Sequence, residues 1–246
     1  MFLSLSIGVG GSKSGIGKTF FIENFIKNIK KQSSAQINII AVKYTKTSLY
    51  SSIITELSII EEEGKDTSRI KKAGADHVYW VKATENDLPE IAEKLKKELF
   101  LHSKPLSEVE GISQTASTTS CFCNRMKKDI IIIEGNSLVR IMQPDVIIFF
   151  KGQNDKQIKP SGKAILEIAD IVIEGEYSME EVMEEIEKFE QKKLIEKLLK
   201  ERSNSGKITC AEARKIAEEI GVPYIEVGRV ANELKIKICK CELGCF

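Results

Sequence analysis

The sequence predicts an α/β protein whose main domain is built on a doubly wound, mainly parallel sheet. Short apolar runs alternate along the chain with segments that carry apolar residues at helical spacing. Several of the runs are apolar at every position, which is typical of strands that helices cover on both faces of a parallel sheet. A glycine-rich, lysine-containing loop also follows the first apolar run directly. These three observations together favour a strand-loop-helix α/β domain.

The expected elements follow from this pattern. After the first run, Phe2 to Val9, strands are expected at Ile37 to Lys43, His77 to Val81, Asp129 to Glu134, Asp145 to Phe150 and Asp170 to Glu174. Helices are expected at Lys18 to Lys31, Asp87 to Leu99 and Ser161 to Ala169. Ligands of such a sheet bind at the carboxyl ends of its strands. We expect the loop before the first helix to share that face with Lys43, Glu134 and Lys151.

The length, composition and net charge of the chain exclude some classes of function. The 246 residues suffice for one α/β domain and a smaller second one. Hydrophobic residues make up 42% and charged residues of mixed sign 30%, with a formal net charge of +1, so bulk charge predicts neither nucleic-acid nor membrane binding. The N-terminal apolar run is too short for a signal peptide and lacks its basic flank, and no run approaches membrane-spanning length. We expect a cytoplasmic protein.

A phosphate-binding loop is the strongest motif of the chain. Its glycines, Gly15 and Gly17, allow backbone N–H groups to close around phosphate oxygens at the N-terminus of a helix. Lys18 would reach the β- and γ-phosphates, and the Thr19 hydroxyl would bind Mg²⁺. We therefore expect a nucleotide, GTP or ATP, to be bound by Lys13, Ser14, Gly15, Ile16, Gly17, Lys18, Thr19 and Phe20. The alternative is an ordinary turn between a strand and a helix.

The loop departs from the usual pattern in its first position, where Ser12 replaces glycine. Lys13, five residues before Lys18, makes the loop resemble the deviant loop of the signal-recognition, partitioning-ATPase and metallochaperone class of P-loop NTPases. Ser14 stands where that class usually has glycine. In that class the extra lysine contacts phosphate, in some members across a dimer interface, so the resemblance implies a homodimer. A solvated surface lysine is the alternative.

Two carboxylates are candidate catalytic residues. Glu134 ends the run Ile130 to Ile133, and a P-loop enzyme holds Mg²⁺ with a carboxylate at the end of such a strand. A helix-capping or loop carboxylate is the alternative for Glu134. Asp66 precedes a helix-like stretch, so it either caps that helix or contacts the metal or the nucleotide. No catalytic arginine or glutamine is evident from the sequence, so a GTPase or ATPase activity would be slow.

Several short motifs resemble the adaptor protein B family of molybdopterin-guanine dinucleotide biosynthesis. They are Gly64-Lys65-Asp66-Thr67 with Arg69, Ala73-Gly74-Ala75, Glu134-Gly135-Asn136 and Pro144-Asp145, within residues 3 to 175. The resemblance implies a GTP-binding protein that assists nucleotide attachment to molybdopterin, with molybdopterin and a molybdenum-cofactor nucleotidyltransferase as partners. It also implies that Asp66 and Arg69 lie on a mobile loop facing the phosphates or the cofactor, and that Glu134 closes the metal site. The chain departs from the family at Ser12, in an insertion over residues 102 to 128, and in an added C-terminal region.

The expected domains are residues 1 to 177, a connecting helix at 178 to 202, and a small helix-turn-helix-like domain at 203 to 246. In this last domain Thr209 is expected to cap a helix that ends at Ile220, and a second helix and a short strand follow. Residues 200 to 246 hold nine Lys or Arg against seven Glu, which provides few phosphate contacts. A protein-interaction or dimerisation module is therefore favoured, and DNA binding stays an alternative.

Five of the six cysteines form two clusters: Cys121 and Cys123, then Cys239, Cys241 and Cys245. In a cytosolic chain such clusters indicate metal or redox chemistry, but packed or merely reducible thiols are favoured here. Three functions thus remain open: a nucleotide-binding adaptor or enzyme, a nucleotide-switched DNA-binding regulator, and a metallochaperone NTPase.

Overall fold

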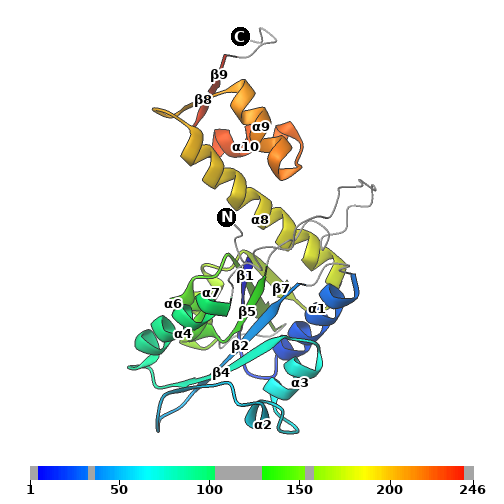
Figure 1. The fold of residues 1–246 in the computed structure, drawn as a ribbon, viewed down its shortest axis with the longest axis vertical. Coiled ribbons are helices and arrows are strands. Elements are labelled where there is room, and N and C mark those ends of the chain that lie inside the picture. Colours follow the sequence, from blue (N-terminus) through cyan, green and yellow to red (C-terminus); the bar gives the residue numbers. More distant parts are fainter. Residues whose placement is uncertain (1–4, 33–36, 103–128, 153–157, 241–246) are drawn as a thin grey trace. The chain divides into compact units, whose positions relative to one another are not determined.

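The computed structural model describes residues 5–32, 37–102, 129–152 and 158–240 (Figure 1). The chain divides into two compact units, Met1–Met183 and Glu184–Phe246, and each unit is described by itself. Within the described residues, no helix is both long and apolar enough to cross a membrane.

The first unit is built on a seven-stranded sheet of order β3-β4-β2-β5-β1-β6-β7. Its strands are β1 (Leu5–Gly11), β2 (Ile39–Lys46), β3 (Ser52–Ile54), β4 (His77–Ala83), β5 (Ile130–Glu134), β6 (Val146–Lys151) and β7 (Ile171–Glu174). Neighbouring strands are parallel except β3, which pairs antiparallel with β4 at the edge. The predicted α/β class with a mainly parallel sheet is confirmed, and β3, too short to show a pattern, was not predicted.

Helices cover both faces of this sheet (Figure 1). They are α1 (Lys18–Gln32), α2 (Leu57–Ile60), α3 (Asp66–Lys72), α4 (Leu88–His102), α6 (Asn136–Met142) and α7 (Pro160–Leu166). Helices α1 and α3 pack on one face, and α4, α6 and α7 pack on the other. The short helices α2 and α6 were not predicted, because four and seven residues are too few to show a helical period.

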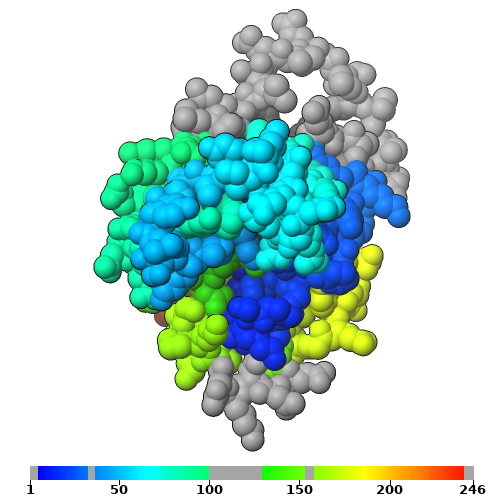
Figure 2. All heavy atoms as spheres, turned by 90° about the horizontal axis from the view of Figure 1, so that it is seen from below, coloured from blue at the N-terminus to red at the C-terminus, as the bar shows by residue number. Residues whose placement is uncertain are grey.

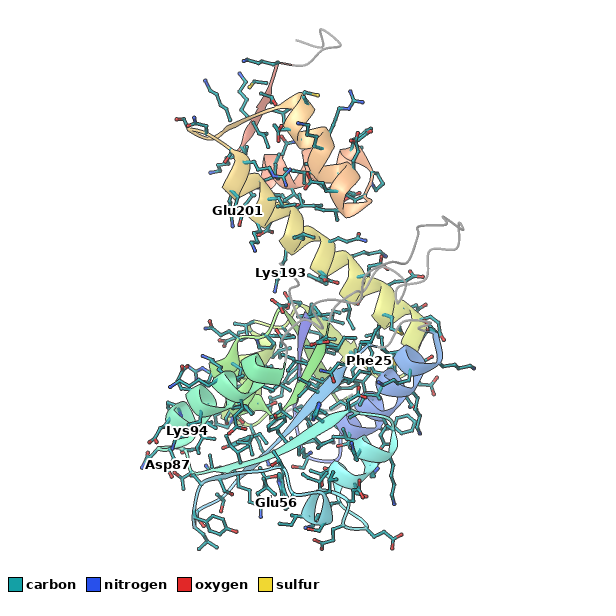
Figure 3. All side chains as sticks on the ribbon, in the orientation of Figure 1. Phe25, Glu56, Asp87, Lys94, Lys193 and Glu201 are labelled. Atoms are coloured by element: carbon teal, nitrogen blue, oxygen red, sulfur yellow. The ribbon has the colours of Figure 1, made fainter. Side chains whose placement is uncertain are left out.

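Aromatic packing anchors α1 to the sheet. Phe21 and Phe25 stack with ring centroids 5.7 Å apart, and Phe21 also meets Phe150 of β6 at 5.3 Å. Figure 3 shows Phe25 inside the unit, whereas Glu56 and Asp87 extend from its periphery. Burying two phenylalanines stabilises this helix by several kcal/mol, at about 1.5–3 kcal/mol each. Their burial holds the beginning of α1 against the ends of the central strands.

The register of the sheet decides which face each polar side chain reaches. Ile131 and Ile133 belong to the core beneath α4, α6 and α7. Because side chains alternate along a strand, Glu134 lies on the opposite face, toward α1. Glu134 is paired in register with Val9 of β1 and with Lys43 of β2. A single cross-strand row therefore brings Lys43 and Glu134 to the same face and the same edge.

The second unit contains most of α8 (Met179–Arg202), then β8 (Lys207–Thr209), α9 (Cys210–Ile220), α10 (Tyr224–Glu233) and β9 (Lys237–Cys239). Strands β8 and β9 pair in parallel, and β8 was not predicted. Thr209 caps α9 as predicted, its hydroxyl accepting a hydrogen bond from the Glu212 N–H at 3.2 Å. Gly221 ends α9 in a left-handed conformation. The apolar core of this unit includes Leu199, Ile208, Ile216, Val227 and Val230.

A glycine at the end of β5 is required by the turn into α6. Gly135 has φ +127°, and a Cβ at this position would lie 2.8 Å from Cβ of Tyr44. We expect Gly135→Ala to destabilise the protein by about 1–3 kcal/mol, measured by denaturant unfolding. Gly228→Ala is the control, because a Cβ there meets nothing within 4 Å inside α10. That change should be neutral or stabilise by up to about 1 kcal/mol, and equal effects at both positions would contradict the packing described.

Candidate functional site

The predicted phosphate-binding loop connects β1 to α1. Gly15 and Gly17 have φ +73° and +101°, values that residues with a Cβ rarely adopt. The Phe21 N–H donates to the Gly17 carbonyl at 2.9 Å, which starts the helix. The Lys18 ammonium donates to the Lys13 carbonyl at 3.2 Å, so it folds back over the loop. The loop therefore carries the Lys18 ammonium and stands at the N-terminus of α1.

A cavity of about 570 Å³ opens beside the loop, bounded by the ends of β2 and β5 and the start of α7. In Figure 2 the dark blue beginning of the chain lies at the surface between yellow-green and yellow segments. Two glutamates, Glu85 and Glu134, line the cavity. The lining lysines outnumber them: Lys13, Lys18, Lys43, Lys46 and Lys159. The cavity is therefore suited to a polyanionic ligand.

A buried carboxylate lies beneath the loop. Glu134 is only 3% exposed. The Thr19 hydroxyl donates to its Oε2 at 3.4 Å, and the Lys43 ammonium lies 2.6 Å from its Oε1. The same ammonium lies 2.8 Å from Oδ2 of Asp66 on α3. The structure thus brings together the three residues predicted to serve catalysis or the metal, Thr19, Glu134 and Asp66, and adds Lys43 between the two carboxylates.

Lys43 and Asp66 stabilise each other's charged forms. Burial alone would lower the pKa of Lys43, but the charge of Glu134 and the hydrogen bonds to Asp66 and Glu134 outweigh it and raise that pKa. Burial would raise the pKa of Asp66, yet the hydrogen bond and charge of Lys43, with Arg69 and Thr19, lower it. Burial lowers the pKa of Lys18, against the opposing charges of Glu134 and Asp66. Lys43 and Asp66 therefore form a stable ion pair at neutral pH.

Asp66 does not cap α3, so that alternative for its role is wrong. The helix begins at Asp66 itself, and Lys65 is the N-cap residue without a side-chain cap. The carboxylate turns instead toward Lys43. Arg69 lies one turn later on α3. Its Nε is 2.5 Å from Oε1 of Glu23 on α1, and its Nη1 is 3.7 Å from Oδ1 of Asp66. These contacts connect α3 to α1 and place Asp66 over the end of β2.

Asn136 fixes the start of the loop, whereas the sequence named it only within a family motif and predicted no role for it. Its side-chain oxygen accepts from the Gly11 N–H, and its side-chain nitrogen donates to the Gly11 carbonyl, both at 2.9 Å. Its place directly after Glu134-Gly135 was the available signal. Lys159, before α7, was also missed, because nothing in its local sequence relates it to a loop far away in the chain.

Only some of the remaining predicted residues line the cavity. Ser12 is buried, its N–H donates to the Phe150 carbonyl at 2.9 Å, and its hydroxyl has no partner among the described residues. Ser14 is exposed and lines the cavity, and Ile16 is partly buried. Phe20 is 57% exposed and does not line the cavity. Lys151 reaches the expected edge but pairs with Glu174 at 2.5 Å, away from the cavity.

Some predictions fall outside the described residues. They concern the insertion after its first residue, at 103–128, which includes Cys121 and Cys123, and the tail cysteines Cys241 and Cys245. Cys210 and Cys239 are described and partly buried. Across the described ranges, no group of three or more His, Cys, Asp or Glu side chains is arranged to hold a metal.

Comparison with known proteins identifies no family for this chain. No protein family and no curated protein matches this sequence. Among solved structures, the crystal structure of LAO/AO transport system kinase is similar at 16% identity and a TM-score of 0.35. The match covers 78% of this chain and 47% of that kinase, so the chain spans about half of the kinase's length. A likeness this low carries no functional argument.

Acid titration tests the Lys43–Asp66 pair. Folding lowers the pKa of Asp66, so its contribution to stability is present above its unfolded pKa of about 3.9 and is lost as pH falls through the folded value. We expect Asp66→Asn to unfold at lower denaturant concentration than wild type at pH 7, and the difference to shrink below about pH 4.

Glu63→Gln is the matched control, since Glu63 is exposed and forms no ion pair among the described residues. Its unfolding midpoint should follow that of wild type across the pH range. If the curves of Asp66→Asn and wild type stay parallel down to pH 2, the ion pair does not stabilise the fold.

Proposed function

We propose that the cavity binds the phosphates of a nucleoside triphosphate with Mg²⁺, and that the chain hydrolyses this nucleotide slowly. The observation that carries the proposal is the contact of Thr19 with the buried Glu134 directly beneath the phosphate-binding loop. A hydroxyl from the loop helix and a carboxylate from the neighbouring strand are the groups with which a P-loop protein holds its metal. An ordinary strand-helix turn has no need of a buried carboxylate at this point.

The cations of the cavity support phosphate binding. Lys43 and Lys46 are neutralised by Glu134 and Glu85, at 2.6 and 2.5 Å. Lys13, Lys18 and Lys159 have no carboxylate partner among the described residues, so their charge is available to a ligand. The loop adds the positive end of α1, a 15-residue helix.

The donors near Thr19 fit Mg²⁺. The Thr19 hydroxyl and the carboxylates of Glu134 and Asp66 are hard oxygen ligands on one side of the loop. Held by these groups, Mg²⁺ would supply positive charge against the charge that develops on the phosphate oxygens. Glu134 would hold the metal directly or through water, and Asp66 would complete its surroundings.

We expect slow hydrolysis because of the residue types that line the cavity. Its described lining contains neither arginine nor glutamine, and the nearby Arg69 is bound to Glu23. A partner or a second copy of the chain would supply the missing group, as the resemblance to the deviant-loop class implies. The choice of GTP and a role with molybdopterin and a molybdenum-cofactor nucleotidyltransferase rest on the resemblance to adaptor protein B.

The C-terminal unit is proposed to contact protein rather than DNA. On α10 the apolar side chains of Tyr224 and Ile225 are 52% and 68% exposed. Arg229 of the same helix is bound to Glu226 at 2.9 Å. A helix that reads DNA presents free cations to phosphate, whereas exposed apolar residues are typical of protein contacts.

Lys18 is the first residue to test. We expect Lys18→Ala to abolish binding of Mg·GTP and Mg·ATP while thermal unfolding changes little, because its ammonium contacts a carbonyl of the loop and no core residue. Isothermal titration calorimetry measures the binding. Lys27→Ala is the control, because Lys27 is exposed on the same helix. Unchanged nucleotide affinity in Lys18→Ala would refute the proposed site.

A change at Glu134 distinguishes metal-dependent hydrolysis from nucleotide binding. We expect Glu134→Gln to keep metal-free nucleotide binding but to lower Mg²⁺-dependent hydrolysis at least ~100-fold, the scale of removing one group that stabilises a transition state. Phosphate release is the measurement. Glu85→Gln changes the other glutamate of the same cavity, whose ion pair is with Lys46, and should hydrolyse at the wild-type rate. Equal rates in the two variants would make Glu134 a structural carboxylate.

A further inference from the structure

The Lys43 ammonium lies between the carboxylates of Glu134 and Asp66, the two acidic side chains of the proposed metal site. Its Nζ lies 2.6 Å from Oε1 of Glu134 and 2.8 Å from Oδ2 of Asp66. The side chains of Lys43 and Glu134 are only 16% and 4% exposed. A buried carboxylate without a cation is costly, so Lys43 stabilises this cluster.

The other nearby cations do not replace Lys43. Lys18 donates to the Lys13 carbonyl, and Arg69 lies 3.7 Å from Asp66 while bound to Glu23. Mg²⁺ requires oxygen ligands at about 2.0–2.1 Å in octahedral geometry. The ammonium already uses one oxygen of each carboxylate, and a divalent ion beside it would be repelled. Lys43 and Mg²⁺ therefore compete for the same two carboxylates.

A nucleotide offers Lys43 another partner. Lys43 lines the same cavity as Lys18, and its four-carbon side chain is flexible, so phosphate entering the loop presents a new anion within this cavity. The Lys43 ammonium can then pair with phosphate instead of with the carboxylates, which become available to the metal.

We propose that Lys43 is an exchangeable counter-ion, which keeps Mg²⁺ out of the empty loop and releases Glu134 and Asp66 to the metal when nucleotide phosphate enters. The inference rests on the proposed function and assigns Lys43 a positioning role within it. It makes Mg²⁺ and nucleotide binding mutually dependent, and by linkage each raises the affinity for the other by the same factor. A lysine that only supported the fold would not weaken metal binding in the absence of nucleotide.

The test measures metal binding in the absence of nucleotide. Mn²⁺ serves as the probe, and electron paramagnetic resonance quantifies the free ion in titrations of the whole chain. Lys43→Met removes the competing charge, and we expect it to bind Mn²⁺ at least ~10-fold more tightly than wild type, within the ~5–150-fold range of typical couplings. Lys46→Met is the control, because Lys46 lines the same cavity but pairs with the exposed Glu85, and it should match wild type.

Equal or weaker Mn²⁺ binding by Lys43→Met overturns the proposal, because a structural lysine leaves a weaker site when removed. If Lys43→Met is unfolded alone, its folding in the presence of Mn²⁺ or Mg²⁺, followed by circular dichroism, supports exchange, since the metal then takes the place of the ammonium. Failure to fold with metal overturns it. Failure of wild type to bind any nucleotide would refute the proposed function separately, because the Mn²⁺ titration contains no nucleotide.

Discussion

A carboxylate buried at the end of the central strand is the constraint on which the site depends. Glu134 is almost wholly removed from water, and a carboxylate in that position is tolerated only with a cation and hydrogen-bond donors at hand. Lys43 and Thr19 supply them. Lys43 in turn holds Asp66, and Arg69 connects that residue's helix to α1. One buried charge thus organises the end of the sheet, the loop helix and α3 together.

The strand order makes this arrangement possible. Because β5 lies between β1 and β2, its last residue is next to both the strand that leads into the loop and the strand that carries Lys43. The two-residue period then puts Lys43 and Glu134 on the face that α1 covers. Aromatic packing of Phe21 against Phe150 positions α1 so that Thr19 reaches the carboxylate. The chemistry of the site is therefore a consequence of topology as much as of the loop motif.

Features of this site that neighbouring residues form together could be predicted from the sequence. Contacts between segments far apart in the chain could not. The loop, the apolar run before Glu134 and the Thr209 cap each leave a signal within a few residues. The Lys43–Asp66 pair leaves none, because it depends on which strands become neighbours and where α3 packs. The same reason explains why Asp66 was open to interpretation as a helix cap. It also explains why no contact with the loop was predicted for Asn136, which lies 125 residues from the Gly11 that it binds.

The most direct measurement is a crystal structure of the protein with Mg²⁺ and a non-hydrolysable nucleoside triphosphate. We expect the triphosphate in the cavity beside the loop, Lys18 on its phosphates, and the metal beside Thr19, Glu134 and Asp66. The Lys43 ammonium should have moved away from Glu134. A nucleotide bound elsewhere, or a loop cavity without phosphate at saturating nucleotide, would contradict it.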